Sequence, residues 1–399
     1  MASIINIVNR YRIGGRHCPF LLTLVCVGIA SLGPLLRAEA QTGVPKNQVI
    51  ATVSVGEFPD CVVVSPDSKT VYVANNGSNS DGYNSSVSVI DAFDNPPYNV
   101  EATIWISNYA LYLALSPDGK TLYVSEYPPS NSGPDVVEVY DVTNPTSPRL
   151  TTTLTVGNFV EGLAVSPNGK QLYVTNGSPV YVIGRGYASS DLAVPAGSIY
   201  VFDTATNTQT NNILCNGSPF QVLFIENGKK ADVLNLAGTG FIQFIQTAKG
   251  TVSNKTGAGG HIFRPSGMVD DALGTTLCVA DSANYVAVCN PTDGTVSAIY
   301  PAVSSVFDLA FLGQPALTPN AQYLYVPYGR GSIAFNAKVG MIPSNNQVAM
   351  INVVTGQIIG SLISVGNDPV WAQASPDGKT LYVANNSDGT VSVIDITPN

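Results

Sequence analysis

Charged side chains are scarce in this chain of 399 residues. They make up 11% of the sequence, less than half of the share in an ordinary globular domain, which is about 25%. This scarcity excludes a coiled coil, an acidic or basic tail and a charge-driven disordered region. Hydrophobic residues account for 45%, and the chain has 37 Gly and 27 Pro. Such a composition is typical of short strands joined by many tight turns.

The chain also has no hydrophobic run long enough to cross a bilayer, which takes about 20 residues. The first 40 residues instead contain three arginines, a short apolar run and a small-residue motif, in this order: Arg10, Arg12 and Arg16, then residues 20–29, then Ala38-Glu39-Ala40. This order is typical of a secretory signal peptide, with Ala30 as an alternative cleavage point. We therefore predict a signal peptide over residues 1–40, export to the periplasm or the extracellular space, and no membrane span in the mature chain.

Basic groups are few in the mature chain. Removal of residues 1–40 leaves 14 basic and 26 acidic groups, a net charge of −12. Negative charge opposes the binding of phosphate groups at long range. Double-stranded nucleic acid and anionic membranes are therefore not among the predicted partners, and we see no basic groove for single strands.

One strand–turn–strand unit recurs along the chain. Four clear copies combine a Ser-Pro turn with a Tyr-Val strand, at residues 65–75, 116–126, 166–176 and 375–385, and three weaker copies turn near Asn227, Asp271 and Thr318. Pro presets φ for the second position of a type I turn, and Asp or Asn and then Gly suit the next positions. An apolar strand precedes each turn and a further strand follows each copy. The sequence thus contains seven units built from strands.

Seven such units predict a ring, because a four-stranded blade needs neighbours to cover both of its faces. The last unit ends after its third strand at Asp395, whereas residues 48–53 form a strand that belongs to no unit. We predict an all-β fold over residues 41–399: a single seven-bladed β-propeller of four-stranded antiparallel blades. The N-terminal strand would complete the last blade and remove its open edge.

Three tetrapeptides give residues 48–396 a resemblance to the YVTN family of seven-bladed β-propellers: Tyr72-Val73-Ala74-Asn75, Tyr173-Val174-Thr175-Asn176 and Tyr382-Val383-Ala384-Asn385. Blades 4 to 6 depart from this signature. The resemblance implies the propeller fold, but no single activity. Proteins that look like this include lactonase-like propellers, exported binding proteins and cell-surface repeat proteins.

Cys278 and Cys289 flank a predicted hairpin of the fifth blade. If residues 283 and 284 form the centre of its turn, the two cysteines lie opposite each other on neighbouring strands. A disulfide is then predicted in an oxidising compartment. The alternative is a pair of buried thiols, since free cysteine is among the most buried residue types.

Alignment of the seven units places carboxylates around the mouth of the central channel. Asp60, Glu161 and Asp308 fall in one column, at the start of an innermost strand, although Asp308 fits only with an insertion near residues 312–316. Ca²⁺ prefers oxygen ligands. We therefore consider Ca²⁺ as a candidate cofactor, and hydrated carboxylates without a metal as the alternative.

The long loops of the predicted propeller fall on the same face as this mouth. They add stacking and hydrogen-bonding groups as binding candidates, namely Arg185, Tyr187 and Arg330. Sugars, planar ligands and protein partners use such groups. The alternative is that the loops are insertions without function, which cost little stability.

His261 is the only histidine of the mature chain, and it lies near Arg264 in the loop before the fifth blade. One imidazole excludes a His-rich metal site. A catalytic histidine needs a nucleophile and an orienting carboxylate, and neither is visible in the sequence. Two functions stay open: an exported binding protein for a small molecule, glycan or protein, and a lactonase-like hydrolase with its site at the channel mouth.

Overall fold

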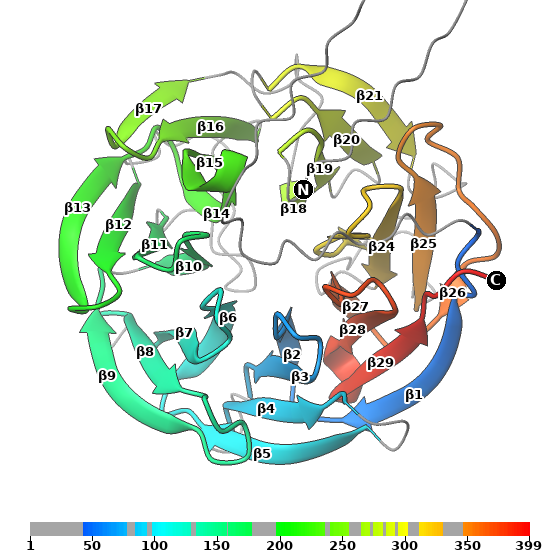
Figure 1. Ribbon diagram of the computed structural model, residues 1–399, viewed down its shortest axis with the longest axis horizontal. Coiled ribbons are helices and arrows are strands. Elements are labelled where there is room, and N and C mark those ends of the chain that lie inside the picture. Colours follow the sequence, from blue (N-terminus) through cyan, green and yellow to red (C-terminus); the bar gives the residue numbers. More distant parts are fainter. Residues whose placement is uncertain are drawn as a thin grey trace, which may run out of the picture. The chain divides into compact units, whose positions relative to one another are not determined.

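The computed structural model describes most of the chain after residue 42: residues 43–77, 84–93, 98–128, 133–157, 159–177, 197–235, 240–254, 265–271, 274–281, 285–291, 294–301, 311–329 and 346–399. They belong to one compact unit, Ala38–Asn399. Seven antiparallel sheets form a ring in this unit (Figure 1). The only helical segments described are two short 3₁₀ turns, η2 (Glu226–Gly228) and η4 (Asn386–Asp388). Among the described residues no helix is long and apolar enough to span a membrane.

The first three blades each contain four strands in sequence order from the channel outwards. Blade 1 consists of β2 (Pro59–Val64), β3 (Thr70–Asn75), β4 (Ser86–Asp91) and β5 (Asn99–Trp105). Blade 2 consists of β6 (Tyr109–Leu115), β7 (Thr121–Tyr127), β8 (Val136–Asp141) and β9 (Arg149–Thr155). Blade 3 consists of β10 (Val160–Val165), β11 (Gln171–Asn176), β12 (Ser198–Asp203) and β13 (Thr208–Leu214).

The next three blades follow the same order, although the sixth has a divided inner strand. Blade 4 consists of β14 (Pro219–Ile225), β15 (Lys230–Asn235), β16 (Phe241–Gln246) and β17 (Thr251–Asn254). Blade 5 consists of β18 (Pro265–Asp270), β19 (Leu277–Asp281), β20 (Tyr285–Cys289) and β21 (Val296–Pro301). Blade 6 consists of β22 (Phe311–Leu312), β23 (Ala316–Leu317), β24 (Tyr323–Gly329), β25 (Gln347–Asn352) and β26 (Ile363–Ser364).

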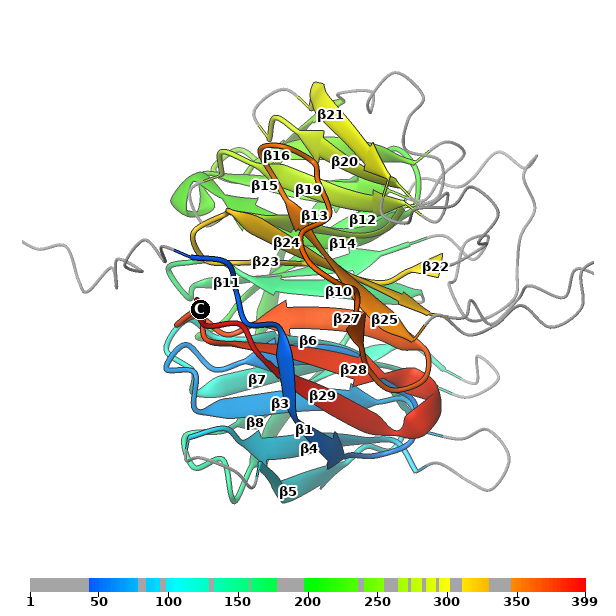
Figure 2. The same ribbon diagram turned by 90° about the vertical axis from the view of Figure 1, so that its right-hand side faces the viewer.

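Blade 7 joins the two ends of the described chain. It consists of β27 (Pro369–Ala374), β28 (Thr380–Asn385), β29 (Thr390–Asp395) and the N-terminal β1 (Gln48–Ser54). Figure 2 shows β1 lying against β29. The innermost strands of neighbouring blades contact one another around the whole ring, from β2 to β27 and back to β2. The predicted propeller, including its closure by the N-terminal strand, is therefore confirmed.

The Ser-Pro turns form through one repeated hydrogen-bond pattern. In blade 1, Ser65 Oγ donates to Asp67 Oδ1 at 2.6 Å and accepts from the Thr70 N–H at 2.9 Å. The serines of the other clear copies do the same, and Thr318 replaces them in blade 6. These turns lie on one face of the ring, which we call the turn face. The opposite face, where the innermost strands begin, is the loop face.

The asparagine that ends the repeat signature anchors the loop face. Asn75 is fully buried and its Nδ2 donates to Ser88 Oγ at 3.0 Å. Gly56 of the preceding loop packs on it so closely that a Cβ there would lie 2.7 Å from Asn75 Cγ. Asn385 and Gly366 repeat the arrangement in blade 7. The signature thus ties each such loop to its blade through an amide and a glycine.

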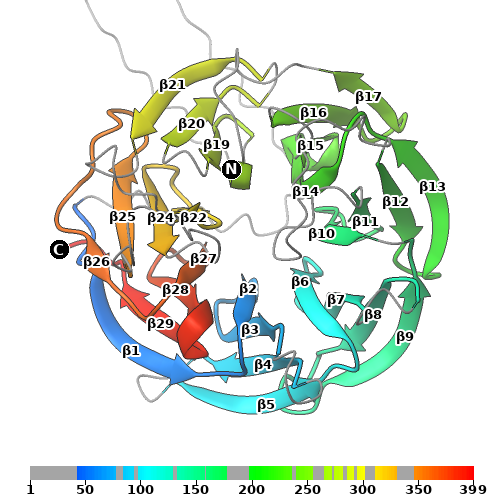
Figure 3. The ribbon, with the colours of Figure 1, turned by 180° about the vertical axis from the view of Figure 1, so that it is seen from behind.

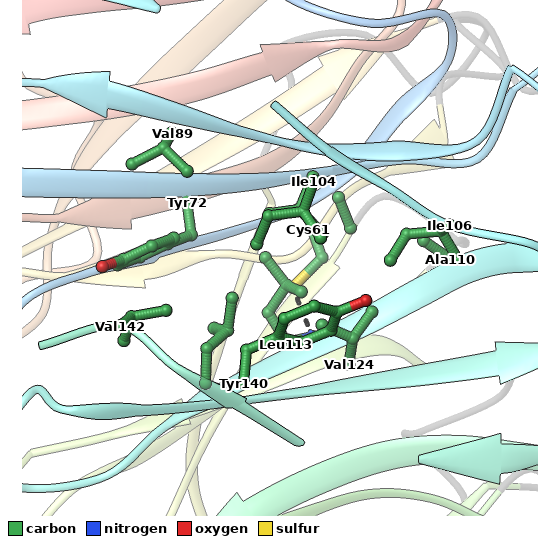
Figure 4. Close-up of a cluster of buried hydrophobic side chains, with 13 residues drawn as sticks. Cys61, Tyr72, Val89, Ile104, Ile106, Ala110, Leu113, Val124, Tyr140 and Val142 are labelled. Carbon is green, nitrogen blue, oxygen red and sulfur yellow. Dashed lines mark hydrogen bonds between the residues drawn. The ribbon is translucent and has the colours of Figure 1, made fainter. Parts of the chain in front are cut away.

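Apolar side chains fill the space between neighbouring blades. Figure 4 shows the cluster between blades 1 and 2, which includes Tyr72, Ile104, Leu113 and Tyr140. Cys61 takes part in it, and its Sγ accepts a hydrogen bond from the Leu113 N–H at 3.4 Å. Neighbouring blades thus pack directly against each other, and this rigid ring holds the innermost strands that form the channel mouth.

The predicted disulfide between Cys278 and Cys289 is wrong. Both cysteines are free and buried. The register pairs Cys278 with Val288, and Leu277 with Cys289. Because successive side chains of a strand point to opposite faces, the two thiols point away from each other. Cys278 packs between blades 5 and 6, and Cys289 packs between blades 4 and 5.

Candidate binding site at the channel mouth

The innermost strands place seven equivalent residues at the channel mouth. Strand register against the second strand of each blade puts them at one position, which lies next to a β-bulge in six blades. They are Asp60, Leu111, Glu161, Phe220, Ser266, Gly313 and Val370. Asp60 and Glu161 therefore stand at the mouth position that the sequence alignment predicts for them.

In blade 6 the register places Gly313, and not Asp308, at the mouth position. Leu312 pairs with Tyr328 and Ala316 pairs with Tyr325. Blade 1 has the same spacing between its corresponding pairs, so blade 6 contains no insertion. The alignment of Asp308 with the mouth column is therefore wrong.

Several predicted site residues lie outside the described residues: His261, Arg264, Asp308, Arg185, Tyr187 and Arg330. Their roles stay predictions. Of the predicted site, the structure describes the two carboxylates Asp60 and Glu161 and what surrounds them.

Three aromatic rings from blades 2, 4 and 7 meet in the channel. The Tyr112 ring centroid lies 5.8 Å from that of Phe220 and 5.7 Å from that of Trp371, in edge-on arrangements. These blades are not adjacent in the ring, as the separate positions of β6, β14 and β27 in Figure 3 show. Because the rings come from blades that are not neighbours, their contact requires them to extend into the channel. They form a layer that we call the aromatic floor.

Two glutamines continue this layer between blades 4 and 6. Gln221 Oε1 accepts from the Met268 N–H at 2.8 Å, and its Nε2 donates to the Met268 carbonyl at 3.0 Å. Gln314 Nε2 donates to the same carbonyl at 2.8 Å. Gly267 leaves room for the Gln314 side chain, because a Cβ at this position would lie 2.1 Å from Gln314 Oε1. These amides satisfy the backbone of the strand between them.

Gln221→Leu is expected to lower the free energy of unfolding by about 2 kcal/mol, because the Met268 N–H stays buried without its acceptor. Denaturant titration of the variant and the parent measures the difference. Gln209→Leu, on the exposed strand β13, is the matched control and should change stability little. A loss below about 0.5 kcal/mol for Gln221→Leu would mean that the amide does not support the backbone.

Asp60 lies in a polar network between blades 1 and 7. The Asn386 Nδ2 donates to Asp60 Oδ1 at 2.6 Å. Burial raises the pKa of Asp60 to about 7, the hydrogen bond from Asn386 lowers it, and the negative charge of Asp368 raises it. Asp60 therefore changes its charge near neutral pH.

The negative charges of Asp60 and Glu161 both affect the ionisation of the Tyr112 hydroxyl. Burial raises the pKa of the Tyr112 hydroxyl well above its ordinary value, and the negative charges of Glu161 and Asp60 raise it further. Two of the three predicted carboxylates thus stand at the mouth position of their blades and act electrostatically on Tyr112. Within the described residues, no group of three or more His, Cys, Asp or Glu side chains is arranged to hold a metal ion.

The described basic residues are confined to one face of the ring, whereas acidic residues occur on both faces. Every described basic residue lies at a strand end on the turn face: Lys46, Lys69, Lys120, Arg149, Lys170, Lys229, Lys230, Lys249 and Lys379. The described part of the loop face has acidic residues instead: Glu57, Asp60, Glu126, Asp135, Glu161, Asp281, Asp368 and Asp388. Within the described residues, acidic groups and no basic groups therefore surround the mouth.

Glu126 is a buried carboxyl of this face that the sequence analysis missed. Its Oε2 accepts from Asn108 Nδ2 at 3.2 Å. Burial raises the pKa of Glu126 to about 9, and the hydrogen bond and charge of Glu138 raise it as well. Glu126 is thus protonated at neutral pH and adds no charge there. Its place in blade 2 is that of Asn75 in blade 1, a substitution that the alignment of repeats could have shown.

Comparisons with known proteins bear on the fold. No family model and no curated protein matches this chain. Among solved structures, a chain of hydrazine synthase from Kuenenia stuttgartiensis is similar, with a TM-score of 0.65, 19% identity, and coverage of 92% of this chain and 100% of that chain. Identity at this level supports the fold alone. The chain is a seven-bladed β-propeller, and the YVTN resemblance stays a prediction.

Proposed function

We propose that this protein is an exported binding or interaction protein that holds a small molecule, a glycan or a protein partner at the channel mouth. The aromatic floor carries the proposal, because Tyr112, Phe220 and Trp371 join three separate blades at the position where the channel would otherwise stay open. Loops and mouths supported by a rigid scaffold are where binding residues concentrate. Asp60 and Glu161 lie at the mouth position of blades 1 and 3, and their negative charges act on Tyr112 of this floor.

The compartment and the additional groups of the proposal come from the sequence. The signal-peptide pattern over residues 1–40 supports export to the periplasm or the extracellular space. Arg185, Tyr187 and Arg330 would extend the binding surface, and Ca²⁺ would bind through Asp60 and Glu161 if it is a cofactor. In the lactonase-like alternative, His261 and Arg264 would serve the reaction.

A thermal-shift screen of the mature chain tests the proposal, because a ligand that binds only the folded state raises the unfolding temperature by mass action. The screen contains sugars, lactones, amines, organic acids and divalent cations, with a chelator control. We expect one class to stabilise the chain, and the Asp60→Asn, Glu161→Gln double variant to lose this effect. Glu101→Gln, on the outer strand β5, is the matched control and should keep it.

Two outcomes would contradict the proposed site. One is a ligand whose stabilisation survives in the double variant, which would place binding elsewhere on the molecule. The other is that no class stabilises the chain and that no protein is captured through the loop face. Lactone consumption that His261→Ala abolishes would favour the hydrolase alternative.

A further inference from the structure

We infer that the ligand of the mouth carries an organic cation, an ammonium group with apolar substituents, that Asp60 and Glu161 hold against the aromatic floor. This inference rests on the proposed function and names the ligand class of the same site. Three observations support it: the aromatic rings, the position of the carboxylates, and the distribution of charge.

The aromatic floor supplies faces that attract a cation. Ring quadrupoles bind ammonium groups within about 6 Å of the ring centroid, and Trp and Tyr are the best partners. Tyr112 contacts both other rings, and Trp371 contributes an indole. Its Nε1 is buried, and no described residue accepts a hydrogen bond from it. Trp371 packs against the apolar clusters of blades 1, 2 and 7, and desolvation of this kind strengthens the attraction between a cation and a ring.

Asp60 supplies negative charge that costs free energy in the absence of a cation. Its hydrogen-bond partner is the neutral amide of Asn386, and its acidic neighbour Asp368 opposes ionisation. All basic residues of the described part lie on the turn face. A bound ammonium group would offset the desolvation of Asp60, because an opposite charge favours the ionised form.

Three more aromatic residues lie on the loop face: Phe58, Tyr109 and Tyr127. Phe58 precedes the strand with Asp60, is 43% exposed, and has a φ of 52°, a region that bulky residues seldom adopt. The rings of Tyr109 and Tyr127 in blade 2 contact each other in a tilted arrangement, at a centroid distance of 4.9 Å. Ca²⁺ takes six to eight oxygen ligands, and the acidic residues in the described part of this face repel an anion. The combination of rings and carboxylates fits an organic cation better than either.

Trp371 allows a direct test, because the chain has 2 Trp and the other, Trp105, is 70% exposed on the outer strand β5. Trp105→Phe leaves Trp371 as the single fluorescent indole. Choline is the cationic probe, and 3,3-dimethylbutan-1-ol is its uncharged isostere. We expect choline to change the Trp371 emission saturably, with an affinity at least about tenfold above that of the isostere. The affinity should rise between pH 6 and pH 8 as Asp60 ionises.

Variants assign the interaction to its groups. Asp60→Asn keeps an acceptor for Asn386 and should weaken choline binding about tenfold and remove its pH dependence. Tyr112→Leu should weaken binding to a similar degree, whereas Tyr112→Phe keeps the ring and should restore most of it. Glu101→Gln should have no effect. The thermal midpoint of each variant shows whether it folds.

The outcomes separate this inference from the proposed function. Equal affinities for choline and its isostere, or no response of Trp371 to choline, would overturn the inference. A neutral or anionic ligand from the thermal-shift screen that depends on Asp60 and Glu161 would overturn it while the proposed function stands. The absence of any ligand that depends on the mouth would overturn both.

Discussion

Deletion of residues 44–54 from the chain of residues 41–399 is expected to lower the unfolding temperature by about 7 °C. These residues supply β1, which pairs with β29 over six positions. Backbone hydrogen bonds contribute about 1 kcal/mol each, so the loss amounts to about 5 kcal/mol. The total stability of a domain is about 5–15 kcal/mol. The buried Val53 adds to the loss. Differential scanning calorimetry measures the midpoint, and light scattering should detect association through the edge of β29.

A circular permutant controls for the removal of chain. The Asn399 N–H donates to the Val44 carbonyl at 3.0 Å, and Pro45 forms an isolated bridge with Pro398. A short glycine linker can therefore join Asn399 to Val44, with the new chain beginning at Val55. This permutant should regain the midpoint of the chain of residues 41–399. A deletion variant that melts within about 2 °C of the parent would mean that β1 does not hold the ring closed.

The fold could be predicted because its information is local and repeated. The Ser-Pro turn fixes two strands at a time through contacts within five residues, such as those of Ser65 with Asp67 and Thr70. Seven copies then specify seven blades, and the missing strand after Asp395 indicates the role of β1. The register error at Cys278 shows the limit of this reasoning. A shift by one residue in a strand pair reverses the face of every side chain, and the turn sequence alone did not fix the register.

The candidate site could be predicted only in part, because its contacts join distant segments. Asp60 and Glu161 came from a column of the repeat alignment. Tyr112 and Trp371 lie one position further along their strands, and their contact requires blades 2 and 7 to face each other across the ring. No spacing in the sequence encodes this contact. The weakest repeat also misled the alignment, since Asp308 was placed where the register puts Gly313.

A departure from the repeat signature places two carboxyl groups between blades 4 and 5. Asp232 takes the place of the repeat tyrosine, and Asp270 takes the place of its partner in the next blade. The corresponding pair between blades 3 and 4 is aromatic, with the rings of Tyr173 and Phe224 4.6 Å apart. Asp232 is fully buried. Within the described part of the chain, neither of its carboxyl oxygens has a hydrogen-bond partner, and neither has Asp270 Oδ2.

These surroundings keep both carboxyl groups protonated up to a higher pH than is usual for aspartic acid. Burial raises the pKa of Asp232 to about 8, and the charge of Asp270 raises it as well. Lys230 lowers this pKa, but it forms an ion pair with Glu226, whose charge raises it. Burial and the charge of Asp271 raise the pKa of Asp270 to about 7. Cys289, which is influenced by Asp232, is a buried thiol whose pKa is also raised and which therefore stays neutral.

The free energy of unfolding is expected to fall as the pH rises from about 4 to about 8. The unfolded chain releases these protons near pH 4, whereas the folded chain retains them to about pH 7 for Asp270 and about pH 8 for Asp232. In this window the folded state binds more protons, so each group lowers stability by up to about 1.4 kcal/mol per pH unit. Asp232→Asn should equal the parent near pH 4 and exceed its stability by about 3 kcal/mol at pH 8. Denaturant titrations between pH 4 and pH 9 measure this difference.

Asp141→Asn is the control for the charge change itself. Hydrogen bonds from Thr143 and Arg149 lower the pKa of the exposed Asp141 to about 2. Its contribution to stability is therefore constant above pH 5 and is lost only as the pH falls toward 2. The effect of Asp141→Asn should not vary between pH 5 and pH 9, whereas that of Asp232→Asn should grow. Parallel curves for Asp232→Asn and its parent would contradict the protonated pair, because a carboxylate that ionises equally in both states cannot couple folding to pH.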